Sequence, residues 1–192
     1  MFKRNLILIF LCLTVISCSG KEDLTELFQK DIMIYLDAYN KTDWEKVTSM
    51  IYPPFFKAVS KYQIIETLKT LDSMGMKRTF TLKGIEKISD VIINGEEKFC
   101  LVNYNTQIII VINKLQLANI EKFKEDFEED FGKENVEYDD KLNQFTISAR
   151  QKIIAASNKD SDNWKYIELN NEHAIDRVLL IISEDILKRL EK

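Results

Sequence analysis

The sequence predicts an α+β domain in which N-terminal helices pack on an antiparallel sheet, joined by an inserted helix and a C-terminal helix. Two observations indicate this class. Apolar residues recur at three- and four-residue intervals through the first third of the chain, the spacing of amphipathic helices. Farther along they alternate with polar residues and include many β-branched types, as in strands with one wetted face. No repeat or low-complexity linker interrupts residues 24 to 192, so we expect one domain there.

Three helices are expected first. Helical apolar spacing runs from Leu24 to Tyr39. Thr42 to Glu45 has the pattern of a capping box, in which the side chains at its two ends satisfy each other's backbone donors. Pro53-Pro54 ends this second helix, because proline lacks a backbone donor and restricts the residue before it. Ser60 to Gln63 is a further capping box, and Gly75 stops the third helix.

A long hairpin is expected next, turning at Asn94-Gly95, the dipeptide most typical of two-residue hairpin loops. The polar residues at 103, 105 and 107 of its second arm predict a sheet that is wetted on one side at mid-strand. The opposite face of this arm carries a continuous row, Cys100, Val102, Tyr104, Thr106, Ile108, Ile110 and Ile112.

Helix and strand patterns then alternate to the end of the chain. Phenylalanines on one stripe predict an inserted helix from Asn119 to Phe131, ending at Gly132. Strands are expected from Leu142 to Ala156 and from Trp164 to Ile167. An asparagine at 170 or 171 begins the last helix, which Ser183 could divide. The expected apolar face of that helix is Ile175, Val178, Leu179, Ile182, Ile186 and Leu190.

The first 17 residues have the layout of a secretion signal. Lys3 and Arg4 precede an apolar run from Leu6 to Ile16, which ends at a small residue. The run is too short to span a bilayer, which needs about 20 apolar residues.

Val15-Ile16-Ser17-Cys18 resembles the lipobox of bacterial lipoproteins. The resemblance implies that the signal, residues 1 to 17, is cleaved between Ser17 and Cys18 and that Cys18 is acylated. The partner of Cys18 is then the membrane, with residues 18 to 23 forming a linker of at most about 20 Å. Several acyl chains would make the attachment stable, since each buried CH₂ contributes about 0.8 kcal/mol. The alternative is an ordinary cleaved signal with Cys18 retained by chance.

Lys21, Glu22 and Asp23 resemble the short export signal of Bacteroidetes-type lipoproteins. That resemblance implies an envelope protein on the outer face of the outer membrane. The alternative is a solvated charged linker on a lipoprotein that faces the periplasm, and protease shaving of intact cells would separate the two.

Composition restricts the partners and the chemistry. Removing Lys3 and Arg4 with the signal lowers the net charge from −4 to −6, which argues against nucleic acid because such proteins carry a basic stripe. Cys12 leaves with the signal and Cys18 carries lipid, so Cys100 remains without a disulfide partner. Its apolar neighbours predict a buried, inert thiol rather than a nucleophile.

Metal and cofactor sites are not expected. His173 is the only histidine and falls in the first turn of the last helix, where a solvated residue is expected rather than a base. Asp126, Glu128, Asp130 and Glu137 superficially follow the spacing of a calcium loop. The glycine that such a loop requires is one position late, so we interpret these acids as a solvated helix face.

Two stretches resemble the nuclear transport factor 2-like, or cystatin-like, fold of small lipoproteins. They are Thr42 to Val47, with its exit at Tyr52-Pro53, and Trp164 to Ile167. The resemblance covers most of the mature chain and implies a curved sheet forming a cone, with a pocket between the helices and its inner face. The inserted helix and the long helix after Leu169 depart from that fold and could fill part of the pocket. Residues expected to line it are Tyr35, Tyr39, Tyr52, Phe56, Tyr104, Trp164 and Tyr166.

Two functions stay open at this stage. The first is a non-catalytic binding module for a small apolar ligand in the cone or for a protein partner on the sheet. The second is a small pocket enzyme, isomerase- or hydrolase-like, in which a carboxylate acts with Tyr104 or Tyr166. The sequence favours binding, because Asp37 lies off the apolar stripe of its helix and no acid falls on the inward strand positions. We therefore expect no catalytic residue and no cofactor.

Overall fold

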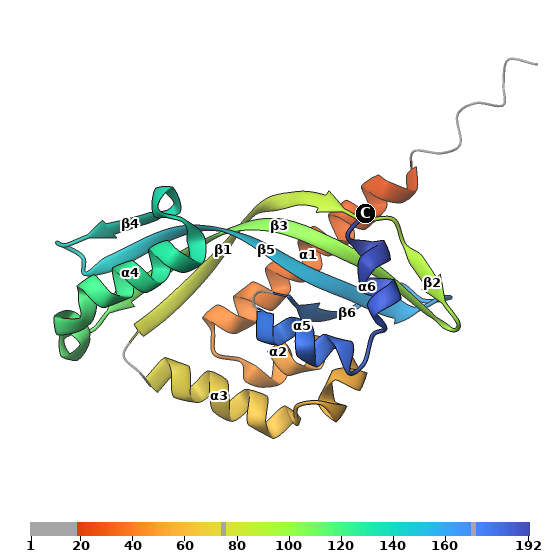
Figure 1. The fold of residues 1–192 in the computed structure, drawn as a ribbon, viewed down its shortest axis with the longest axis horizontal. Helices are drawn as coiled ribbons and strands as arrows, with labels where there is room; N and C mark the ends of the chain where they lie inside the picture. The colour runs from red at the N-terminus through yellow and green to blue at the C-terminus, as the bar shows by residue number, and fades with distance from the viewer. Residues whose placement is uncertain (1–18, 74–75, 170–171) are drawn as a thin grey trace, which may run out of the picture.

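The computed structural model describes residues 19–73, 76–169 and 172–192 (Figure 1). Ser17 and Cys18 lie outside the described residues, as do the side chains of Lys21, Glu22, Asp23 and His173. The α-helices are α1 (Ser19–Asn40), α2 (Trp44–Met50), α3 (Lys61–Ser73), α4 (Ile120–Phe131), α5 (Glu172–Leu179) and α6 (Glu184–Leu190). Short 3₁₀ helices are η1 (Pro53–Lys57), η2 (Lys114–Asn119) and η3 (Lys133–Asn135). The strands are β1 (Met76–Ile88), β2 (Ile92–Asn94), β3 (Glu97–Ile112), β4 (Val136–Asp139), β5 (Gln144–Asn158) and β6 (Lys165–Glu168).

The strands form one curled antiparallel sheet in the order β1-β3-β5-β4, with β2 also paired to β3 and β6 also paired to β5. The pairing of β1 with β3 shifts register at two places, between Leu82 and Gly84 and between Ile85 and Lys87. Such bulges bend a strand and increase its twist. They contribute to the curl that Figure 1 shows along the length of β1 and β3.

One face of the sheet is covered by α1, α2 and α3. Their apolar stripes pack on the even-numbered residues of β3 in a cluster that we call the main core, which has Phe28, Ile32, Val47 and Tyr104 among its most buried members. The Asn40 side chain at the end of α1 also bonds to the edge of β1, since its amide donates to Phe80 O and accepts from Phe80 N, each at 2.8 Å. Helix α1 is therefore fixed both to the face and to the edge of the sheet.

The opposite face is covered at one end by α5 and α6. Val178, Ile182, Ile186 and Leu190 are buried there against strand residues that include Phe99 and Ile154. We call this cluster the back core. Farther along the sheet, α4 lies over Ile108, Ile110, Phe145 and Ile147 on the same face as the main core, and this third cluster is the end core.

Several sequence predictions are confirmed by these elements. The α+β class and the inserted helix are present, with Asn119 at the N-cap of α4 and Gly132 at its C-cap. The Ser60–Gln63 capping box has both reciprocal bonds, with the Ser60 N–H donating to Gln63 Oε1 at 3.1 Å and the Gln63 N–H to Ser60 Oγ at 3.2 Å. Ser183 divides the last helix, and every residue of the predicted inward row of β3 is buried.

Other predictions are wrong in detail. The N-cap of α2 is Asp43, which accepts from the Lys46 N–H at 3.0 Å, while Thr42 has a φ of +56°. Helix α1 begins at Ser19 instead of Leu24, so residues 19 to 23 are helical rather than an extended linker.

The strands also differ from expectation. The hairpin loop is Gly95-Glu96 instead of Asn94-Gly95, because Asn94 already pairs with Glu97 and only Gly95 takes a positive φ, +63°. The first arm of that hairpin is split into β1 and β2, and the four-residue strand β4 was not predicted. On the predicted C-terminal face, Ile175 and Leu179 are exposed, whereas Val178, Ile182, Ile186 and Leu190 are buried.

No helix in the part of the chain that the structure describes is both long and apolar enough to cross a membrane.

Candidate functional site

Five of the seven predicted pocket aromatics meet in the main core. They are Tyr35 and Tyr39 of α1, Tyr104 of β3, Trp164 just before β6 and Tyr166 of β6. Helical spacing directs the first two toward the sheet, and two-residue alternation directs Trp164 and Tyr166 toward α1. The structure thus brings together these segments, which are far apart along the chain.

Tyr52 and Phe56 do not belong to this group. Tyr52 is buried in the back core, where its ring lies edge-on to Phe99 and its hydroxyl bonds to the Glu97 carboxylate. Phe56 is half-buried in η1, whereas its neighbour Phe55 packs against the back core. Tyr52 lies outside the main core because the chain leaves α2 as an extended segment beside β6, where the Tyr52 N–H donates to Tyr166 O at 3.0 Å, and the Tyr52 side chain turns to the opposite face of the sheet.

Two tyrosines of the main core donate to carboxylates across the same interface. The Tyr166 hydroxyl of β6 donates to Asp31 Oδ2 of α1 at 2.5 Å. The Tyr35 hydroxyl of α1 donates to Glu168 Oε1 of β6 at 2.8 Å. Each element thus supplies one donor and one acceptor, and the two bonds join α1 to β6 reciprocally.

Burial determines the protonation state of these phenols. Desolvation is the largest cause that raises the pKa of Tyr35, Tyr104 and Tyr166 above the ordinary value of 10.0, and the adjacent carboxylates Glu168 and Asp31 raise it further. A tyrosine with a raised pKa stays protonated at neutral pH and acts as a hydrogen-bond donor. These phenols are therefore poor general bases, and two of them already donate to a protein carboxylate.

Sequence reasoning missed the two carboxylates. Asp31 lies four residues before Tyr35 and three after Phe28, so helical spacing alone places it beside the apolar stripe. Glu168 follows Trp164 and Tyr166 in two-residue alternation and so shares their face of β6. Extending these two periodicities by one position would have found both acids.

Aromatic packing fills the space between α1 and the sheet. The Phe28 ring lies edge-on to Trp164 with centroids 5.3 Å apart, and Tyr39 lies edge-on to Trp44 and to Phe80 at 5.1 and 4.9 Å. Phe28 and Tyr104 are 0% and 2% exposed. The space between α1 and the sheet, where the predicted cone would hold a ligand, is therefore filled by side chains.

An open pocket of about 550 Å³ lies elsewhere, where the C-terminal end of α4 comes next to the middle of β3 and β5. Its lining is mostly polar, and sequence reasoning did not identify it because the contributing segments are distant in the chain. The lining residues are Lys83, Asn105, Thr106, Asp130, Phe131, Asn135, Ser148, Ala149 and Arg150. Arg150 is paired with Glu86 at 2.6 Å, and Asn135 donates to Phe131 O at 2.8 Å.

The described residues contain no group of three or more histidine, cysteine, aspartate or glutamate side chains able to hold a metal. Asp126, Glu128 and Asp130 lie along α4 and Glu137 lies in β4, so the acids with calcium-loop spacing do not form a loop. Cys100 is fully buried, and burial raises the pKa of its thiol to about 12.

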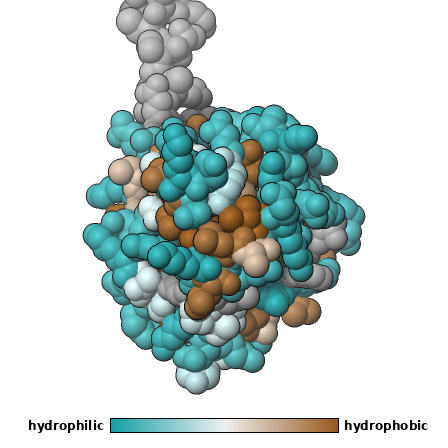
Figure 2. All heavy atoms as spheres, turned by 90° about the vertical axis from the view of Figure 1, so that its left-hand side faces the viewer, coloured by the Kyte–Doolittle hydropathy of each residue, from teal (hydrophilic) through white to brown (hydrophobic). Residues whose placement is uncertain are grey.

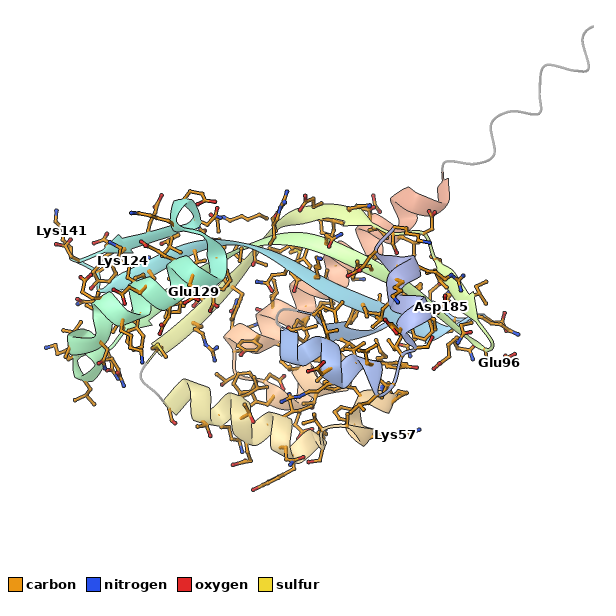
Figure 3. The ribbon with its side chains drawn as sticks, viewed as in Figure 1. Lys57, Glu96, Lys124, Glu129, Lys141 and Asp185 are labelled. Carbon is orange, nitrogen blue, oxygen red and sulfur yellow. The ribbon has the colours of Figure 1, made fainter. Side chains whose placement is uncertain are left out.

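The two ends of the sheet differ in their surfaces. The start of α1 lies toward one end, and α4 and β4 lie toward the other (Figure 1). At the α4–β4 end, Figure 2 shows apolar side chains gathered at the centre of a polar surround. Leu115 and Leu142 are 88% and 61% exposed there. Figure 3 places charged side chains at the same end, among them Lys124, Glu129 and Lys141, and acids outnumber lysines from residue 120 to residue 141.

No protein-family model matches this chain, and a search of curated proteins finds no significant match.

Proposed function

We propose that the protein is a membrane-anchored envelope lipoprotein whose domain, of the nuclear transport factor 2-like type, binds a partner on its outer surface rather than a ligand in its interior. The observation that carries this proposal is the packed main core. Its aromatic rings fill the space between α1 and the sheet, and the hydroxyls of Tyr35 and Tyr166 already donate to carboxylates of the protein.

The anchor is supported by the sequence and by the start of α1. Cys18 ends a lipobox-like tetrapeptide, and the helix begins at the next residue, Ser19. With no extended linker, the domain is held near the bilayer. The export-signal resemblance at residues 21 to 23 supports an outer-membrane location with the domain at the cell surface.

The fold assignment is supported by three helices on the inner side of a curled antiparallel sheet. Helix α4 and the pair α5–α6 are additions to that fold. They do not enter the main core, since α4 covers the end core and α5–α6 cover the opposite face of the sheet. The interior is filled by aromatic residues of α1, β3 and β6 instead.

Binding is favoured over catalysis by the state of the tyrosines. An enzyme that used Tyr104 or Tyr166 with a carboxylate would need the phenol or the acid to face a substrate. In this core the Tyr166 hydroxyl is directed at Asp31, and Tyr104 is 2% exposed. Asp31 and Glu168 provide the acids that this alternative lacked, but they accept hydrogen bonds from protein phenols.

Metabolic labelling with a clickable fatty acid tests the anchor. Wild-type protein should incorporate the label, Cys18→Ala should lose it, and the control Cys12→Ala should keep it. Label retained by Cys18→Ala would refute lipidation at that residue. Protease shaving of intact cells then tests orientation, because a domain that faces the periplasm survives the treatment.

A further inference from the structure

The outer edge of β5 is paired at both ends and open in the middle. Strand β4 pairs with residues 144 to 147 of β5, and β6 pairs with residues 153 to 156. Residues 148 to 152 pair with β3 on their inner side throughout. Leu169 extends the β6 pairing to Lys152, so the outer row of the sheet has a gap about 16 Å long from Ile147 to Lys152, at about 3.3 Å per residue.

The hydrogen-bonding pattern determines which backbone groups face this gap. Just before β5, Asn143 accepts a hydrogen bond through its carbonyl oxygen from the Ile112 N–H of β3, at 2.9 Å. Because the backbone groups of a strand alternate in direction, the odd-numbered residues of β5 bond to β3. The Leu169 N–H donates to Lys152 O at 2.9 Å, so even-numbered residues of β5 bond outward. The N–H and C=O groups of Ser148 and Arg150 therefore point into the gap, and within the described chain no backbone or side-chain group bonds to them.

The gap is accessible from solvent. The open pocket includes Ser148, Ala149 and Arg150 in its lining, and the side chains of Ser148 and Arg150 are exposed. Asn135 and Phe131 close the end of the pocket toward β4.

We propose that an extended segment of a partner protein binds in this gap as an added strand between β4 and β6. Outward backbone donors and acceptors that repeat every second residue, about 7 Å apart, match the backbone of another strand. A segment of about four residues fits the gap, opposite residues 148 to 151, and the polar residues of the pocket lining favour polar side chains on its inner side. This inference rests on the proposed surface-binding function and specifies its partner.

The test uses the full-length purified protein and a display library of random heptapeptides. Peptides selected on wild-type protein are synthesised, and their affinities are measured by calorimetry for wild type, Ser148→Pro and Ser148→Ala. Proline removes the outward N–H of Ser148 and places its ring in the gap without deleting a bond to β3. We expect Ser148→Pro to weaken binding by about tenfold or more and Ser148→Ala, which keeps the N–H, to stay within about twofold.

Amide hydrogen exchange on wild-type protein provides a test that does not depend on whether Ser148→Pro folds. The Ser148 and Arg150 amides should exchange fast in the free protein and slowly with peptide bound, whereas Ala149 and Gln151 should be slow in both. Slow exchange at Ser148 and Arg150 in the free protein, no selected peptide, or equal binding by Ser148→Pro would overturn the inference. Such a result would leave the anchor and the packed interior standing, because those are measured separately.

Discussion

The Tyr166 hydroxyl donates to Asp31 Oδ2 at 2.5 Å and so links the closing strand β6 to α1. A hydrogen bond to a charged group typically contributes about 1.5–3 kcal/mol. We expect Tyr166→Phe to lower the free energy of unfolding by about that amount, because Asp31 loses its donor in a partly buried place. Urea unfolding measures this change.

A double-mutant cycle with Asp31→Ala isolates the pair. Since both single variants remove the same bond, the double variant should cost clearly less than the sum of the two. Tyr62→Phe serves as a control, because that ring is 71% exposed and its loss should change little. Strict additivity at Tyr166 and Asp31 would show that the bond contributes nothing.

Alkaline pH should destabilise the fold. Burial raises the pKa of Tyr35, Tyr104 and Tyr166 in the folded state, so the unfolded chain loses these protons first, near the ordinary pKa of 10.0. The stabilisation that they provide is complete below pH 10 and declines as the pH rises above it. Each such group contributes a slope of up to about 1.4 kcal/mol per pH unit.

Unfolding free energies measured between pH 8 and 11 test this expectation. Tyr104→Phe should reduce the alkaline slope, whereas Tyr62→Phe should leave it unchanged. The same slope in wild type and Tyr104→Phe would contradict the assignment of Tyr104 as a buried phenol that ionises only on unfolding.

Thr42 and Asp43 are both candidates for the N-cap of α2, and two substitutions distinguish them. Asp43 accepts the Lys46 N–H, and Asp43→Ala should cost about 1 kcal/mol. Thr42 has a φ of +56°, a strained value for a β-branched residue, so Thr42→Gly should stabilise the protein by up to about 1 kcal/mol. Thermal unfolding of both variants measures these changes in stability. If Thr42→Gly destabilised the protein, Thr42 rather than Asp43 would be the N-cap of α2.

Cys100 should be chemically silent in the folded protein. It is 0% exposed, and a thiol with a pKa of about 12 is protonated at pH 8. In a Cys12→Ala/Cys18→Ala background, iodoacetamide should label Cys100 only after unfolding in urea. Rapid labelling of the native protein would show that β3 is accessible at this position.

The fold was largely predictable from sequence where a pattern extends over many residues. The two-residue alternation from Cys100 to Ile112 predicted the inward face of β3, and the phenylalanine stripe of α4 predicted an inserted helix. Strand β4 was missed because four residues, Val136 to Asp139, are too few to show a period. Tyr52 lies on the opposite face because the chain after α2 pairs with β6 as an extended segment, and a helical period does not predict that pairing.

The candidate sites were less predictable, because they depend on contacts between distant segments. Periodicity places Asp31 and Glu168 beside the apolar faces of their elements, but it does not show which tyrosines they meet. The open edge of β5 depends on where β4 ends and β6 begins, and no local pattern at Ser148 or Arg150 reports this.

Native mass spectrometry of the full-length protein, purified from the membrane of the cells that make it, tests the anchor and the packed interior together. We expect a polypeptide that begins at Cys18, carries acyl mass and retains no small apolar ligand, because the main core is filled. An unacylated chain, or a chain that retains an apolar molecule until it unfolds, would contradict this expectation.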